Sequence, residues 1–181
     1  MATLYTVSRN VTFDEGAILS LKRFDTAVKD LSALSNFQEI EEYLSLNYPE
    51  GLSRHGFKYL LEKNSHQDGP IDNDTAMEML FEMVRMLKFP QKNSRFNSFF
   101  GFESLEGARD FRKKSGKPGD PIYKIECQHY FRMDMNWLRL GASPLKGLMF
   151  AQNYWKGIPS EDPYWECLIK FPIQIVEEVV N

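Results

Sequence analysis

The residues best suited to chemistry lie in one stretch, Asn93 to Phe102, which combines an arginine with asparagine, serine and phenylalanine. The pattern predicts a short strand, and a two-residue period then places Arg95, Asn97 and Phe99 on one face and mainly aromatic residues on the other. Arginine and asparagine are hydrogen-bonding groups that a purely structural strand rarely needs. We therefore expect the polar face to contact a ligand and the aromatic face to anchor the strand.

Few other named chemistries fit the residues. The sequence contains no glycine-rich phosphate loop, no nucleophile elbow and no HExxH motif. The three histidines, His55, His66 and His129, are far apart in the chain, so no local motif supports a serine or cysteine hydrolase. The two cysteines, Cys127 and Cys167, are too few for a disulfide framework and lack the spacing of a zinc site. They indicate a reducing environment.

Composition indicates one compact domain over residues 1–181. With 181 residues, 43% of them hydrophobic, the chain can bury a sizeable core. A formal net charge of −3 and a sequence pI near 5.7 argue against a protein that coats nucleic acid through charge alone. No apolar run is long enough to span a bilayer, and the first residues lack the pattern of a secretory signal. We therefore expect a cytoplasmic protein with no membrane contact.

Hydrophobic periodicity predicts strands near both ends of the chain and helices between them. Strands are expected at residues 3–8, 93–102, 122–131 and 164–171, and 173–176 could continue the last of them. Helices are expected within 25–63, at 75–87, at 104–111 and from 143 to 157. Residues 17–24 fit either an extended segment or the start of a helix, and 133–140 fit one or two helical turns. This order predicts an α+β fold with a helical middle at about residues 25–90 beside a mainly antiparallel sheet.

The clearest of these helices covers residues 75–87. The spacing of Thr75 and Glu78 is that of a capping box. Its apolar stripe is expected in the core and comprises Met77, Leu80, Phe81, Val84 and Leu87. Near the end of the chain, Tyr154 and Trp155 are likewise expected to anchor the core rather than to stack on a ligand.

Three strand segments follow one another in an order that resembles the three motifs of ADP-ribosyltransferases. They are Leu4–Arg9, Ser94–Phe100 and Trp165–Ile169. The chain looks most like a little-characterised bacterial and phage group allied to that superfamily, in which Ser-Arg-Phe-Asn-Ser-Phe-Phe, Tyr-Trp-Lys-Gly and Glu-x-Leu segments recur. The resemblance implies an ADP-ribosyltransferase-like fold with a split sheet, and a role among toxins or in phage defence.

The resemblance also implies that NAD is bound as a substrate across the split between two small sheets. Arginine would lie near its phosphates or ribose, amide and hydroxyl groups would bond to its nicotinamide ribose or amide, and aromatic rings would pack against a ring. The residues implied for these contacts are Tyr5, Ser8, Arg9, Arg95, Asn97, Ser98 and Phe100. Strand alternation would put Asn97 and Ser98 on opposite faces, so a bulge or a strand end is needed if both are to meet one ligand.

Glu166 is the residue that the resemblance implies for catalysis. Breaking the N-glycosidic bond of NAD releases neutral nicotinamide and leaves an oxocarbenium-like ribose, which a carboxylate can stabilise while it orients the 2′-hydroxyl. The acceptor would be a macromolecule, either protein or nucleic acid. Without the resemblance, a strand glutamate is more often solvated, and Arg9 and Arg95 could instead pair with acidic side chains at strand ends.

The sequence departs from better-known members of the superfamily in two ways. Thr6 stands where one branch has histidine, and no Ser-Thr-Ser triplet follows the start of the second motif. These departures admit an alternative, a non-catalytic module that binds a partner's basic surface through the acidic stretch Glu39–Glu42. A third alternative is a nucleic-acid modifier with Lys113, Lys114 and Lys117 in its groove. The oligomeric state is not indicated.

Overall fold

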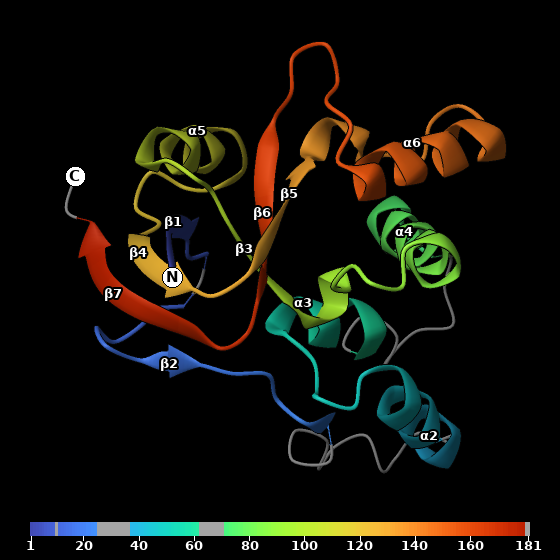
Figure 1. Ribbon diagram of the computed structural model, residues 1–181, viewed down its shortest axis with the longest axis horizontal. Helices are drawn as coiled ribbons and strands as arrows, with labels where there is room; N and C mark the ends of the chain where they lie inside the picture. The colour runs from blue at the N-terminus through green and yellow to red at the C-terminus, as the bar shows by residue number, and fades with distance from the viewer. Residues whose placement is uncertain (10, 25–36, 62–70, 180–181) are drawn as a thin grey trace.

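Two antiparallel sheets form the framework of the protein (Figure 1). The computed structural model describes residues 1–9, 11–24, 37–61 and 71–179. One sheet has four strands in the order β1–β4–β7–β2, and the other has three in the order β3–β6–β5. The strands are β1 Ala2–Val7, β2 Ile18–Leu19, β3 Ser98–Gly101, β4 Ile122–Cys127, β5 Tyr130–Asp134, β6 Trp165–Lys170 and β7 Ile173–Val179. The predicted α+β class with a mainly antiparallel, divided sheet is confirmed.

The helices gather beside these sheets. They are α2 Phe37–Asn47, α3 Arg54–Gly56, α4 Asn73–Lys88, α5 Leu105–Ser115 and α6 Pro144–Lys156, together with the π-helical η2 Phe57–Leu61 and the 3₁₀ turns η4 Arg95–Asn97 and η5 Met135–Trp137. Figure 1 shows α3, α4 and α6 on one side of the three-stranded sheet and the four-stranded sheet on the other side. The parts of the predicted helical middle at 25–36 and 62–70 lie outside the described residues. No helix within the described ranges is long and apolar enough to cross a membrane.

The stretch from Asn93 to Phe102 is not one continuous strand. Residues 95–97 form η4, because the Ser94 Oγ accepts a hydrogen bond from the Phe96 backbone N–H at 3.0 Å and starts a turn instead of a strand. Strand β3 begins only at Ser98. The predicted face of Arg95, Asn97 and Phe99 is therefore wrong.

The segment after this turn joins the two sheets. Tyr5 of β1 and Phe102 exchange backbone hydrogen bonds of 2.9 and 2.7 Å, and the Thr6 hydroxyl donates to the Phe100 carbonyl at 2.9 Å. Gly101 permits this approach, since a Cβ there would lie 2.8 Å from the Tyr5 carbonyl oxygen. The first two segments of the resemblance thus lie side by side.

Helix α4 begins and faces differently from the prediction. Its N-cap is Asp72, which accepts from the Thr75 N–H at 2.8 Å, so the capping box of Thr75 and Glu78 is wrong. Phe81 is buried as expected, but Leu87 is 79% exposed. The helix instead turns Glu78 toward the interior, where that side chain has polar partners.

The predicted strands at 122–131 and 164–176 are each two strands. Residues 122–127 form β4 and 130–134 form β5, while 165–170 form β6 and 173–179 form β7. In both cases the first and second strand of the pair belong to different sheets. The remaining elements follow the prediction closely: α5 begins after its N-cap Ser104, and α6 runs from the N-cap Ser143 to Gly157, whose φ of +70° suits glycine. Residues 17–24 include β2, and 133–140 include η5.

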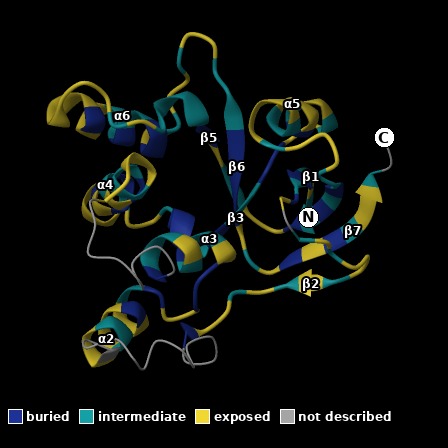
Figure 2. Ribbon diagram, turned by 180° about the vertical axis from the view of Figure 1, so that it is seen from behind, coloured by how far each residue is buried: buried dark blue, intermediate teal, exposed yellow. Residues whose placement is uncertain are grey.

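Strand β6 separates two parts of the core, as Figure 2 shows by its buried colour. Between the sheets lie Leu4, Tyr123, Ile125, Cys127, Cys167, Ile169, Ile173 and Ile175. Between the three-stranded sheet and the helices α4 and α6 lie Phe81, Val84, Met133, Ala151, Tyr154, Trp155 and Leu168. Tyr154 and Trp155 are fully buried, which confirms them as core residues. By alternation, Glu166 faces the helices together with Leu168.

Replacing Gly56 by alanine tests the contact between α3 and η4. The Ser53 N–H and hydroxyl both donate to the Phe96 carbonyl at 2.9 Å, and a Cβ at Gly56 would overlap that same oxygen. We expect Gly56→Ala to lower the free energy of unfolding by about 1–3 kcal/mol, as measured by chemical denaturation. Gly119→Ala is the control, because a Cβ there meets nothing within 4 Å. Equal losses in the two variants would contradict this packing.

Candidate functional site

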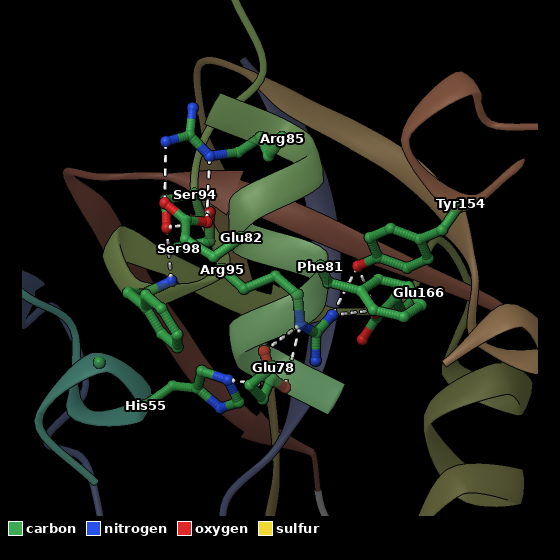
Figure 3. A network of polar contacts seen from close by, with 12 residues as sticks. His55, Glu78, Phe81, Glu82, Arg85, Ser94, Arg95, Ser98, Tyr154 and Glu166 are labelled. Carbon is green, nitrogen blue, oxygen red and sulfur yellow. Dashed lines mark hydrogen bonds and ion pairs between the residues drawn. The ribbon is translucent and has the colours of Figure 1, made fainter. Parts of the chain in front are cut away.

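The buried side chain of Arg95 binds two carboxylates from different elements (Figure 3). Its Nε donates to both oxygens of Glu78 at 3.1 and 2.9 Å, and its Nη1 donates to Glu166 Oε1 at 2.6 Å. Arg95, Glu78 and Glu166 are only 6%, 2% and 4% exposed. The three side chains form a buried carboxylate–arginine cluster that joins α4, η4 and β6.

Tyr154 completes the contacts of the cluster with α6. Its hydroxyl accepts a 2.5 Å hydrogen bond from Arg95 Nη1 and donates to Glu166 Oε1 at 2.7 Å. The guanidinium also lies 4.8 Å from the ring centroid of Phe100, within the range of a cation–π contact. The cluster therefore draws on four elements: α4, η4, α6 and β6.

His55 links the cluster to the surface. Its Nε2 lies 3.0 Å from Glu78 Oε1, within ion-pair distance but without the angle of a hydrogen bond, and its side chain is 19% exposed. The imidazole ring packs against Phe100 and Tyr59, with centroid distances of 4.9 and 4.6 Å. His55 is thus the neighbour of Glu78 that is partly exposed to solvent.

A second buried carboxylate of α4, Glu82, lies one helical turn after Glu78. Glu82 accepts hydrogen bonds from the Tyr48 hydroxyl at 2.9 Å, from the Ser94 hydroxyl at 2.8 Å, and from Arg85 Nε and Nη2 at 3.0 and 2.8 Å. Because Ser94 and Arg95 are consecutive, the turn η4 is held to α4 at both Glu82 and Glu78.

Burial and charge oppose each other within the cluster. Burial alone would raise the pKa of Glu78, but the charges of Arg95 and His55 and the hydrogen bonds from Arg95 lower it to about 2. Burial likewise opposes the charged form of Arg95, yet Glu166 and Glu78 hold its pKa well above the ordinary value. For Tyr154, burial and the neighbouring Glu166 raise the pKa, so its hydroxyl stays a donor. The arrangement keeps a cation and a carboxylate ionised in the interior.

The structure brings some of the predicted site residues together. Arg95 and Glu166 are in direct contact, and Phe100 packs on Arg95. Ser98 lies at the end of η4, where its hydroxyl donates to the Ser94 carbonyl at 2.7 Å. Asn97 is half-buried, and its Oδ1 has no hydrogen-bond partner among the described residues. Strand alternation therefore does not place Asn97 and Ser98 on opposite faces, because Asn97 belongs to the turn η4 and β3 begins at Ser98.

The remaining predicted contacts lie near the other sheet. Arg9 is exposed, donates to the Ser115 carbonyl at 3.3 Å and lies 5.4 Å from the Phe111 ring centroid. Ser8 donates its hydroxyl to the Val11 carbonyl, and Tyr5 packs beside the cluster of Phe102, Ala108 and Ile122. Roles for these three residues in binding NAD stay predictions.

Sequence reasoning missed three residues in or beside the cluster: His55, Glu78 and Tyr154. Periodicity gave no signal for Glu78, because Glu78 and Glu82 lie beside the apolar stripe that was predicted to be buried and not within it. For Tyr154, the expectation of burial itself implied a partner for the hydroxyl. His55 carried no comparable signal, and His66 lies outside the described residues. Among the described side chains, no group of three His, Cys, Asp or Glu residues could hold a metal ion.

The fold and the cluster define an α+β protein with two antiparallel sheets and a buried carboxylate–arginine network. The chain belongs to the family described as "Protein of unknown function (DUF2441)", whose model matches residues 24–181. A comparison with curated proteins found no relative. The matched region includes Glu78, Arg95, Tyr154 and Glu166 but not the segment Leu4–Arg9.

Acid is expected to weaken the fold through Glu78. Because the pKa of this carboxyl is lowered from 4.5 to about 2, its stabilising effect is present above pH 4.5 and is lost as the pH falls through about 2. The effect amounts to about 3 kcal/mol. The difference in free energy of unfolding between the wild type and Glu78→Gln should therefore shrink between about pH 6 and about pH 2, as measured by denaturant titration at each pH.

Glu177→Gln is the control for this measurement, because it removes a carboxylate whose side chain is 53% exposed. It should change the free energy of unfolding little at any pH. A constant difference between the wild type and Glu78→Gln across the acidic range would contradict an ionised, paired Glu78.

Proposed function

We propose that the protein is an NAD-dependent ADP-ribosyltransferase that modifies a macromolecular acceptor, with Glu166 as its catalytic carboxylate. One observation supports this most directly: Arg95 and Glu166, 71 residues apart in the chain and taken from two segments of the resemblance, meet at 2.6 Å. A carboxylate held in place by a cation is what the transfer needs for the positive charge that develops on the ribose of NAD.

The hydrogen bonds of Glu166 leave one oxygen for a substrate. Arg95 and Tyr154 both bind Oε1, whereas Oε2 accepts no hydrogen bond from the described residues. In the proposed reaction, Oε2 orients the 2′-hydroxyl of the ribose while the bond between ribose and nicotinamide breaks. Arg95 and Tyr154 then act as positioning residues, because both hold the carboxylate through Oε1.

A non-catalytic binding module is the second candidate, and the low exposure of the cluster favours it. Glu166 is 4% exposed, and its charge is already paired with Arg95. Buried ion pairs of this kind also occur where they only specify how elements pack. In this reading the exposed acidic residues of α2, Glu39 and Glu42, would meet a basic surface of a partner.

Release of nicotinamide distinguishes the two candidates. The protein is incubated with millimolar NAD and a cell lysate, and free nicotinamide is measured. We expect release by the wild type and a fall of about 100-fold or more in Glu166→Gln, since charge stabilisation of a transition state typically contributes that much. Tyr154→Phe, which removes one hydrogen bond to Oε1, should retain part of the activity.

Controls separate loss of catalysis from loss of folding. Glu177→Gln makes the same chemical change at an exposed position and should release nicotinamide at the rate of the wild type. Circular dichroism and the unfolding temperature show whether each variant is folded, and NAD should raise the unfolding temperature of the wild type. Absence of both nicotinamide release and a thermal shift in the wild type would favour the binding module.

A further inference from the structure

A polar cavity lies on the other side of the turn η4 from the carboxylate–arginine cluster. Its volume is about 240 Å³, many times the ~15 Å³ that one water needs. It is framed by the end of α2, the segment after α4, the turn η4 and the end of β6, which supply among others Asn47, Lys92, Asn97 and Lys170. The size suits a small ligand or one end of a larger one.

The charges on the wall of this cavity are mainly positive. Arg85, Lys92 and Lys170 line it, and among the described residues the only acidic one in the lining is Glu50, which is exposed. The Arg85 guanidinium is committed to Glu82 and also donates to the Lys92 carbonyl at 3.0 Å, so it holds the wall in place. Lys92 and Lys170 are therefore the basic residues of the lining whose charges have no such commitment.

Neither lysine has an acidic partner among the described residues. The Lys92 ammonium lies 4.2 Å from the ring centroid of Phe131, and burial lowers its pKa. A partly desolvated ammonium over an aromatic ring gains more from an anion than a solvated one does. Two cations at one concave, polar surface also focus the field on that surface.

We propose that this cavity binds a small phosphate-bearing molecule. A phosphate group carries up to two negative charges and three acceptor oxygens, which match the two lysines of the lining better than one carboxylate does. The side-chain amides of Asn47, Asn93 and Asn97 supply further hydrogen-bonding groups on the wall. Leu21 and Phe171 form an apolar part that suits the body of the ligand.

This inference is independent of the proposed transferase activity. Glu78, Arg95, Tyr154 and Glu166 do not line the cavity. Along α4, Glu78 and Arg85 are about two turns apart, which is roughly 10 Å. A small ligand in the cavity therefore does not contact the carboxylates, and binding can be measured without any turnover of NAD.

Calorimetric titration with inorganic pyrophosphate at a fixed, low ionic strength tests the proposal. We expect saturable binding by the wild type and a dissociation constant roughly tenfold higher or more in the double variant Lys92→Gln/Lys170→Gln. The matched control is Lys113→Gln/Lys156→Gln, which removes two exposed helical lysines outside the cavity and so makes the same change in net charge. Its dissociation constant should stay within about twofold of the wild type.

Three results would overturn the proposal, provided that circular dichroism shows the variants to be folded. The first is the absence of saturable binding to the wild type. The second is an equal loss of affinity in the two double variants, which would mean attraction by net charge alone. The third is binding of succinate as tight as that of pyrophosphate, which would exclude selectivity for phosphate. Failure to release nicotinamide would leave the titration unaffected.

Discussion

The arrangement of the protein depends on one buried positive charge, the guanidinium of Arg95. Removing such a group from water costs several kcal/mol unless carboxylates and hydrogen bonds replace its hydration. The hydration of Arg95 is replaced by Glu78 of α4, Glu166 of β6 and Tyr154 of α6. Because each partner must lie within hydrogen-bonding distance, the charge restricts how α4 and α6 can sit on the three-stranded sheet. An apolar contact would tolerate sliding of the helices, whereas this one does not.

Local chemistry made part of the fold predictable. The serine caps and following residues of α5 and α6 define those helices from a few neighbours in the chain, and the structure follows them. The assignment of strands to two sheets was not predictable in the same way. Strands β4 and β5 belong to different sheets, as do β6 and β7, but the alternation of apolar and polar residues along these strands does not show which sheet each one joins. At Ser94 two local signals competed, and the capping hydroxyl outweighed the strand-like pattern of the residues that follow it.

The only part of the candidate site that was predictable came from the order of the three segments that resemble ADP-ribosyltransferase motifs. That order assigned Arg95 and Glu166 to one proposed NAD cleft, and the two side chains are in contact in the structure. The order of segments did not predict that Glu78 and Glu82 of α4 are buried. Two glutamates four residues apart fit a solvated helix face or a cap equally well. The contribution of Glu78 arises from a contact across 17 residues whose geometry depends on the turn between them. The hydrophobic periodicity of the sequence does not predict such a contact between two elements.

The sheet order also has a consequence for how the chain reaches its fold. Strand β1 pairs with β4, so that Ala2 lies opposite Cys127, and β4 in turn pairs with β7 near the other end of the sequence. To form such distant pairings, the chain loses the conformational entropy of a long loop before stabilising contacts form, and this makes folding slow. During synthesis, β1 has no partner in its own sheet until β4 has emerged, and β4 keeps an open edge until β7 follows. For that period the nascent chain exposes unpaired strand edges, the form in which chains are most prone to aggregate or to need a chaperone.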